Sequence, residues 1–307
     1  MNVRLCRGGG RLLGLGSRVT VVVGNFDGVH RGHQALLAAA RSADPGAKLA
    51  MVSFYPHPAV ALGRSSPFPP LTGLRRKLKL ISAHGVDLLW LIRFTPAFSG
   101  LDAEEFIDRF LIGALGMTLL AGGRDLSFGR LRAADADQIA ALLARRKRRL
   151  HLVEFEERAG RKISSRRIRE LLLAGRAADA AALLGSPFGV GGKVVPGDRR
   201  GRRLGFPTAN LGRVRELLPA NGVYAVRAIV SGSEYRGVAN VGIRPTFGGG
   251  RPLLEVHLAG YQGPEFYGAR MEVLFLDRIR DERRFDGEAD LKRQIALDLE
   301  AALRARG

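Results

Sequence analysis

Residues 19–33 read VTVVVGNFDGVHRGH, and this stretch decides the fold of the first half of the chain. Val19 to Val23 is a short, mostly β-branched apolar run, which is typical of a buried strand. Gly24 and Gly28 permit a tight turn after it, and the residues from His30 onward predict the start of a helix. A buried strand that turns directly into a helix indicates an α/β sheet, whose ligands bind at the carboxyl ends of the strands.

Outward from this turn, apolar runs alternate with amphipathic stretches as far as residue 184. We expect further strands at 48–54, 88–94, 118–121 and 150–154, and helices at 34–41, 73–83, 103–111, 136–144, 163–173 and 177–184. This alternation predicts a doubly wound, Rossmann-like parallel sheet in a first domain that spans residues 18–184.

The pattern changes after Gly185-Ser186-Pro187, where glycines recur and the apolar runs become short. We expect strands at 222–230, 235–241, 253–258 and 270–275. Their spacing is typical of a barrel or a sandwich, so residues 185–307 are predicted to form a β domain. Residues 288–304 return to a helical period, which predicts a C-terminal helix that closes the barrel.

The composition bounds the class of protein. A length of 307 residues with 46% hydrophobic residues is typical of a globular protein with two domains. No apolar run is long enough to span a membrane and no secretion signal is evident, so we expect a cytoplasmic protein without a membrane partner. The single Cys6 excludes an internal disulfide framework and a cysteine-based zinc cage.

The net charge of +20 indicates either a nucleic-acid surface or a protein that handles phosphates. The 42 arginines and 7 lysines are spread through the chain, and the densest cluster, residues 145–149, follows a predicted helix whose dipole it suits. We therefore disfavour a nucleic-acid role. A homo-oligomer remains open.

His30 and His33 are three residues apart at the predicted helix start, so their side chains are expected to face the same way. Two imidazoles together with free backbone N–H groups would bind a polyphosphate and neutralise the charge that grows as a bond to phosphorus breaks. Zinc is an alternative ligand, although no third zinc-binding residue is evident. A turn of polar residues without function is the other alternative.

The stretch GNFDGVHRGH resembles the nucleotide-binding motif of the HxGH nucleotidyltransferases and, in its longer form, that of the bacterial bifunctional riboflavin kinase/FAD synthetase family. The resemblance continues in the family's order through FYPHP (54–58), DAEEF (102–106), GRDLSFG (123–129), ISSRRIR (163–169), GRRLGFPTAN (201–210), GVANVGIRPT (237–246) and LEVH (254–257). It ends at Phe285 and covers nearly the whole chain from Arg18.

The resemblance implies that the first domain transfers AMP from ATP to the phosphate of FMN, which gives FAD and pyrophosphate. His30 and His33 would act as catalytic residues that contact the ATP phosphates. The other residues implied for binding ATP and FMN are Gly24, Asn25, Phe26, Asp27, Phe54, His57, Asp125, Ser164, Ser165 and Arg169. From the residues alone, Ser164 equally fits a helix N-cap and Arg169 a surface arginine.

The same resemblance implies a riboflavin kinase barrel that makes FMN from riboflavin and ATP. Glu255 matches the family's general base, although the alternating LEVH pattern also fits a strand residue that faces solvent. Thr208 and Asn210 would bind Mg²⁺ and the ATP phosphates through hard oxygen atoms. ATP would also contact Gly201, Arg202 and Pro207, and the flavin would contact Asn240, Arg244 and Phe285.

Four positions in the first half depart from the family's pattern. Arg166 stands where threonine is usual, Leu126 where phenylalanine is usual, and Leu131 and Ala134 where glycines are usual. They keep a second interpretation open, a riboflavin kinase whose first domain binds nucleotide weakly or serves in assembly. A third interpretation is a basic nucleic-acid-binding protein, which would need no Mg²⁺ and ATP.

Overall fold

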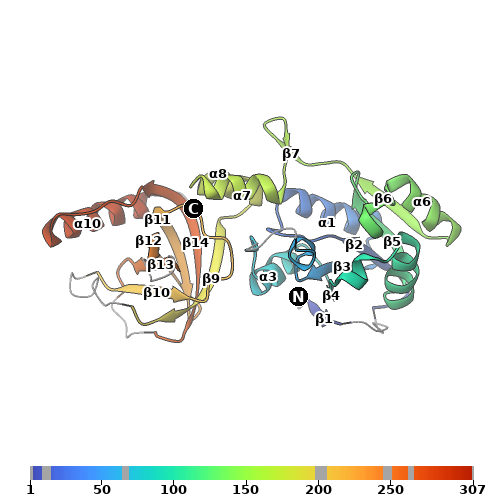
Figure 1. Cartoon of the computed structure of the whole chain (residues 1–307), viewed down its shortest axis with the longest axis horizontal. Coiled ribbons are helices and arrows are strands. Elements are labelled where there is room, and N and C mark those ends of the chain that lie inside the picture. Colours follow the sequence, from blue (N-terminus) through green and yellow to red (C-terminus); the bar gives the residue numbers. More distant parts are fainter. Residues whose placement is uncertain are drawn as a thin grey trace. The chain divides into compact units, whose positions relative to one another are not determined.

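The computed structural model describes residues 3–8, 15–63, 69–197, 206–244, 251–261 and 266–305 (Figure 1). The chain divides into two compact units. The first unit comprises Met1–Phe68 and Leu74–Ile163, and the second comprises Pro69–Gly73 and Ser164–Gly307.

A six-stranded parallel sheet forms the centre of the first unit. Its strands are β1 (Arg4–Arg7), β2 (Val19–Val23), β3 (Lys48–Tyr55), β4 (Leu88–Arg93), β5 (Met117–Gly123) and β6 (Arg149–Val153). They lie in the order β1-β4-β3-β2-β5-β6, and every pairing is parallel. The predicted Rossmann-like sheet is confirmed, with β1 as an additional edge strand that the sequence pattern did not indicate.

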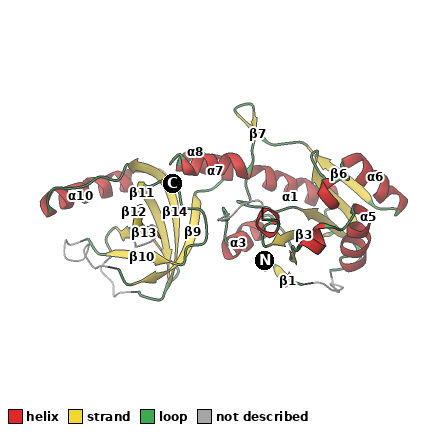
Figure 2. Ribbon diagram, viewed as in Figure 1, coloured by secondary structure: helices red, strands yellow, loops and turns green. Residues whose placement is uncertain are grey.

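Helices cover both faces of this sheet (Figure 2). They are α1 (Arg31–Ala43), α2 (Pro58–Ala61), α3 (Leu74–Ala83), α4 (Pro96–Ser99), α5 (Ala103–Glu105) and α6 (Ala136–Arg145), with a π-helical continuation of α5 at Phe106–Ala114 and a 3₁₀ turn η2 at Arg130–Arg132. Neighbouring residues of β2 point to opposite faces: Val22 packs with Leu37 of α1 and Ile81 of α3, whereas Val21 belongs to the core that holds Leu111 and Ile139. This arrangement is the doubly wound fold that the sequence predicts.

A short hairpin of β7 (Glu157–Arg158) and β8 (Arg161–Lys162) lies near the end of the first unit. The second unit begins with α7 (Ser165–Leu173) and α8 (Ala177–Leu184), and α8 packs against strands of a barrel.

The barrel of the second unit is antiparallel and closed. Its strands are β9 (Phe188–Val195), β10 (Thr208–Gly212), β11 (Gly222–Val230), β12 (Ser233–Arg244), β13 (Arg251–Leu258) and β14 (Arg270–Arg280), and α10 (Glu288–Arg304) follows. The rings of Phe188 and Tyr224 contact Phe275, with centroids 6.1 Å and 5.4 Å from it, and fill the interior.

Helix α10 lies against the outside of this barrel. Its Ala302 packs on Val223, Ala225 and Leu276, residues that alternate with the interior set. The expectation that the C-terminal helix closes the barrel is therefore wrong: β9 closes the ring because it pairs with both β10 and β14.

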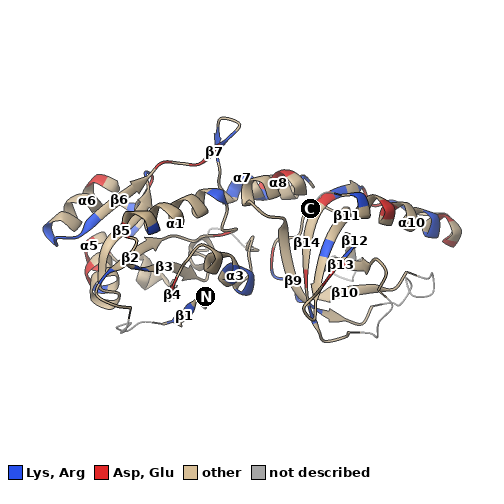
Figure 3. Cartoon of the chain, turned by 180° about the vertical axis from the view of Figure 1, so that it is seen from behind, with Lys and Arg blue, Asp and Glu red and all other residues tan. Residues whose placement is uncertain are grey.

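Two surface properties bear on the class of protein. Among the described residues, no helix is both long and apolar enough to cross a membrane. Lysine and arginine residues are spread over both units (Figure 3).

Candidate active sites

The turn between β2 and α1 has a constrained backbone. Phe26 and Val29 have φ angles of 47° and 45°, a left-handed conformation that a β-branched valine rarely adopts, and Gly28 between them has a φ of 90°. Phe26 and Val29 are fully buried in the core beneath α1. Strained backbone of this kind persists where the surrounding structure fixes it, and it is typical of functional sites.

Side chains from two other elements hold this turn at Asn25. The hydroxyl of Ser53 on β3 donates to the carbonyl oxygen of Asn25 at 3.1 Å, and Nζ of Lys77 on α3 donates to the same oxygen at 2.9 Å. The side-chain Oδ1 of Asn25 is buried and has no hydrogen-bond partner within the described part of the chain. Neither Ser53 nor Lys77 was a candidate from sequence, since a lysine on an amphipathic helix usually faces solvent.

His30 and His33 lie face to face at the start of α1, with ring centroids 3.6 Å apart and an angle of 17° between the planes. His30 is the N-cap of the helix, and its Nδ1 accepts the backbone N–H of His33 at 3.4 Å. Because Nδ1 accepts, the proton of the neutral ring is on Nε2. The ring of His33 also contacts the ring of Phe26, with centroids 5.0 Å apart.

Both imidazoles are neutral at pH 7. Burial lowers the pKa of His30 from 6.5 to about 4, and the negative charge of Asp27 offsets this only in part. Burial, followed by the neighbouring His30, lowers the pKa of His33 well below its usual value. Without a phosphate nearby, these neutral rings supply hydrogen bonds and no positive charge, and their predicted neutralisation of phosphate charge stays a prediction.

Phe54 and His57 make contacts within the first unit. Phe54 on β3 packs edge-on against Phe94 at 5.5 Å. Nδ1 of His57 caps the short helix α2 by accepting the backbone N–H of Ala59 at 3.2 Å. Their predicted contact with substrate stays a prediction.

Asp125 lies just beyond the carboxyl end of β5, the edge of the sheet where ligands are expected. Its carboxylate accepts a hydrogen bond from Nζ of Lys162 at 2.6 Å. The same ammonium lies 3.4 Å from the centroid of the Phe155 ring. Lys162 also acts electrostatically on His30, so it places a second lysine charge near the histidine pair, His30 and His33.

Three departures from the family's pattern are accommodated by the fold of the first unit. Leu126 and Ala134 are buried and join the core that packs on one face of the sheet. Leu131 lies in the 3₁₀ turn η2, is 80% exposed and has a φ of 56°. This last residue thus keeps the backbone conformation that suits glycine, without a glycine.

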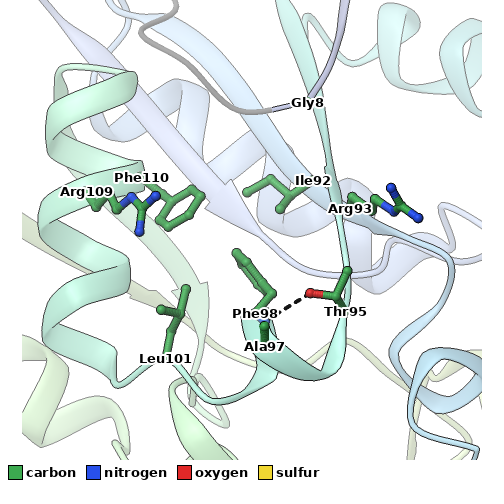
Figure 4. Close-up of a pocket in the computed structure, with 9 residues that line it drawn as sticks. All are labelled: Gly8, Ile92, Arg93, Thr95, Ala97, Phe98, Leu101, Arg109 and Phe110. Atoms are coloured by element: carbon green, nitrogen blue, oxygen red, sulfur yellow. Dashed lines mark hydrogen bonds between the residues drawn. The ribbon is translucent and has the colours of Figure 1, made fainter.

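A cavity of about 340 Å³ lies at the carboxyl end of β4 (Figure 4). Its lining residues are Gly8, Ile92, Arg93, Thr95, Ala97, Phe98, Leu101, Arg109 and Phe110. The hydroxyl of Thr95 accepts the backbone N–H of Phe98 at 3.1 Å, which fixes the turn of α4 along one wall. None of the residues singled out from sequence lines this cavity.

Ser164, Ser165 and Arg169 belong to helix α7 of the second unit. Oγ of Ser164 caps the helix by accepting the backbone N–H of Arg167 at 3.3 Å, and Ser165 is its first residue. Nη1 of Arg169 donates to the carbonyl oxygen of Pro69 at 2.7 Å. The proposed phosphate clamp of these three residues stays a prediction.

The remaining departure, Arg166, also lies on α7. Its side chain is 90% exposed and pairs with Glu170 one turn along the helix, with a 3.1 Å separation between Nε and Oε1. The larger side chain of Arg166 therefore lies on the surface of the second unit and is not packed against other side chains of its interior.

Asn210, Glu255 and Asn240 form a row across three neighbouring barrel strands, which we call the outer row. Asn210 on β10 opposes Glu255 on β13, which opposes Asn240 on β12. Opposed residues of antiparallel strands share one face, and successive residues along a strand alternate between the two faces. The residue before Asn240 on β12 is paired with Tyr224, which faces the interior, so Asn240 and its row face outward. The three polar side chains thus lie together on the outer face of the barrel.

Close packing fixes two members of the outer row. A Cβ added to Gly197 would lie 2.7 Å from Cγ of Asn210, whose residue is only 8% exposed, so a side chain at position 197 would displace this amide. Nδ2 of Asn240 donates to Oε1 of Glu282 at 3.1 Å. Oδ1 of Asn240 is buried and lacks a hydrogen-bond partner among the residues described.

The other candidates of the second unit are placed as follows. Thr208 is exposed at the first position of β10, and the carbonyl oxygen of Pro207 accepts from Nδ1 of His257 at 2.9 Å. Phe285 lies under the guanidinium groups of Arg280 and Arg283, at 5.7 Å and 4.7 Å. Gly201, Arg202 and the side chain of Arg244 lie outside what the structure describes.

Fold and candidate sites together define a class of protein: a transferase that joins a nucleotidyltransferase-like α/β unit to a barrel with a polar outer row. Comparison with known proteins places the chain within that class. The family model for FAD synthetase matches residues 16–167, and the model for riboflavin kinase matches residues 184–305. The chain belongs to the bifunctional riboflavin kinase/FMN adenylyltransferase family.

Individual relatives support this over nearly the full length. The bifunctional riboflavin kinase/FMN adenylyltransferase of Bacillus subtilis is 37% identical over 295 residues, which cover 94% of this chain and 92% of that protein. The Escherichia coli K12 protein of the same name is 38% identical, covering 91% of this chain and 90% of its own. A Streptococcus pneumoniae crystal structure named as a macrolide-efflux protein matches with a TM-score of 0.89 and 33% identity. The match covers 95% of this chain and 96% of that chain.

The chain therefore carries out two ATP-dependent steps. Its C-terminal part phosphorylates riboflavin to FMN, and its N-terminal part adenylates FMN to FAD and releases pyrophosphate. The alternatives of a non-catalytic first domain and of a nucleic-acid-binding protein are not favoured by these relatives.

Proposed function

We propose that adenylyl transfer to FMN takes place at the strained turn between β2 and α1, and phosphoryl transfer to riboflavin at the outer row of the barrel. The observation that carries the first assignment is the stacked, neutral histidine pair at the N-terminus of α1. We assign the two activities to residues 18–184 and 185–307, respectively, and we place the enzyme in the cytoplasm, where ATP is available.

In the adenylyl transfer, an oxygen of the FMN phosphate attacks the α-phosphorus of ATP, and the bond from that phosphorus to pyrophosphate breaks. The Nε2–H of His30 is free of the cap contact and would donate to a phosphate oxygen, together with backbone N–H groups at the helix start. A neutral ring keeps this donor throughout the reaction. Gly24, Asn25, Phe26 and Asp27 shape the turn against which adenosine and flavin would bind.

In the phosphoryl transfer, the 5′-hydroxyl oxygen of riboflavin attacks the γ-phosphorus of ATP, and ADP leaves. Glu255 would accept the proton of that hydroxyl, and its place between Asn210 and Asn240 gives it polar neighbours on a barrel face. The unpartnered Oδ1 of Asn240 would accept a hydrogen bond from the flavin.

We propose Mg²⁺ as the cofactor of the kinase step. The hydroxyl of Thr208 and the amide oxygen of Asn210 fit it, because Mg²⁺ prefers hard oxygen ligands and keeps several waters. When bound, the ion offsets negative charge on the ATP phosphates. The amide of Asn210 lies close to Gly197, and the residue is only 8% exposed.

Separating the flavins formed by matched variants tests both assignments. Glu255→Gln should lower FMN formation from riboflavin by about 100-fold or more, because the proton acceptor is lost, and should still convert supplied FMN to FAD. Glu234→Gln, on an exposed pair with Arg227, is the control and should match the wild type. His33→Asn should show the reverse pattern, with a loss of FAD formation alone. Equal loss of both steps in Glu255→Gln would contradict the assignment.

A further inference from the structure

A positive charge that acts on the histidine pair comes from helix α3. Nζ of Lys77 lies 2.9 Å from the carbonyl oxygen of Asn25, and its charge acts on His33 and is itself affected by Asp27. This hydrogen bond is the one that the ammonium makes within the described part of the chain. An ammonium group has three N–H donors, so two remain for another acceptor.

The surroundings of Lys77 suit an anionic ligand. Burial lowers the pKa of the Lys77 ammonium, and Asp27 counters this only in part, so the charged lysine is incompletely compensated in the absence of substrate. Next to it, two neutral imidazoles offer donors without charge, and Nδ1 of His33 is a buried atom without a partner among the described residues. The cluster thus combines hydrogen-bond donors with one cation at a helix start.

Lys162 is a weaker candidate for the same role. Its ammonium is 2.6 Å from the carboxylate of Asp125 and lies over the ring of Phe155, and its side chain is 42% exposed. An ion pair with phosphate contributes less binding free energy when the lysine is exposed and already paired than when it is desolvated.

We propose that Lys77 is a pyrophosphate-binding residue of the adenylyl transfer, which contacts the β- and γ-phosphates of ATP while the carbonyl oxygen of Asn25 holds its ammonium at the turn. The inference deepens the proposed function and rests on its placement of this step at the histidine pair. As the bond to the α-phosphorus breaks, negative charge builds up on the departing pyrophosphate. The fixed ammonium stabilises that charge without moving.

The test uses the full-length protein and the reverse reaction, in which FAD and pyrophosphate give FMN and ATP. Lys77→Met should lower kcat/KM for pyrophosphate by about 100-fold, as expected for the loss of a preorganised charge. Lys77→Gln, which keeps an N–H donor near Asn25 but not the charge, should show a similar loss, and Lys77→Arg should recover most of it. Lys79→Met, an exposed lysine on the same helix, is the matched control and should leave the value unchanged.

Riboflavin phosphorylation by the same preparations reports on the integrity of the chain. An unchanged kcat/KM for pyrophosphate in Lys77→Gln would overturn the inference, because the lysine would then only hold the turn. If Lys77→Met fails to fold, the comparison of the glutamine and arginine variants decides. If His33→Asn leaves FAD formation intact, the location of the adenylyl transfer itself is wrong, which is a separate outcome from failure of the Lys77 variants alone.

Discussion

At the residue scale, the ring of His30 links the stability of the first unit to its chemistry. It caps α1, stacks on His33 and is buried, so the neutral form is built into the fold. The sequence places both histidines at a helix start, and that much follows from the motif. Their protonation does not follow from it, because it depends on burial that a local pattern does not show.

We expect the first unit to lose stability as the pH falls from 7 toward 4. The folded His30 has a pKa of about 4, whereas the ordinary value for histidine is 6.5, so between these values the unfolded chain binds more protons and stability rises with pH. Once the pH has fallen below both pKa values, this difference lowers the free energy of unfolding by about 3 kcal/mol. The lowered pKa of His33 acts in the same direction. Thermal melts across this range should slope less in His30→Asn than in the wild type. Equal slopes would contradict the role of His30.

Gly197 provides a second test at the residue scale, for the kinase step. Gly197→Ala would push the amide of Asn210 out of place, and kcat/KM for riboflavin phosphorylation should fall by about 100-fold. Gly191→Ala on the preceding strand β9 is the matched control, because nothing lies within 4 Å of its added Cβ. FAD formation from supplied FMN should be unaffected in both. The prediction fails if the two alanine variants phosphorylate riboflavin equally well.

At the scale of elements, the sequence identified the buried strands well and the glycine-containing strands poorly. β2 and β4 are continuous apolar runs, and their predicted ranges agree with the structure to within a residue. β9 contains three glycines and β10 is five residues long, so neither shows a clear alternation, although both are needed to close the barrel. The contact between α3 and the turn could not be predicted from a local sequence pattern either, because Lys77 and Asn25 are 52 residues apart.

The 3₁₀ turn η2 allows a stability prediction at this scale. Leu131→Gly should stabilise the first unit by up to about 1 kcal/mol, because relief of the left-handed backbone exceeds the added entropy of the unfolded chain. The exposed side chain loses little packing. Leu131→Ala keeps the Cβ and should gain nothing. Chemical denaturation of the three proteins measures the difference, and a destabilised glycine variant would contradict the prediction.

At the scale of the whole molecule, the order of motifs along the chain was enough to predict both folds and both reactions. Each motif set falls on its own unit of structure, apart from the segment Ile163–Arg169, which begins α7. Compositional arguments were weaker: the charge of +20 reflects lysines and arginines that are spread over both units (Figure 3). The relatives, and not the charge, decide between a flavin nucleotide enzyme and a nucleic-acid-binding protein.

The ring of strands in the second unit has a consequence for behaviour at high concentration. Because β9 pairs on both sides, the described strands of the barrel present no unpaired row of backbone groups on which another chain could assemble. The parallel sheet of the first unit does have two borders, β1 and β6, and these carry Arg4, Arg7 and Arg149. The edge strands of the parallel sheet are charged, and the strands of the barrel form a closed ring. Both features should keep the folded enzyme from forming intermolecular β-aggregates.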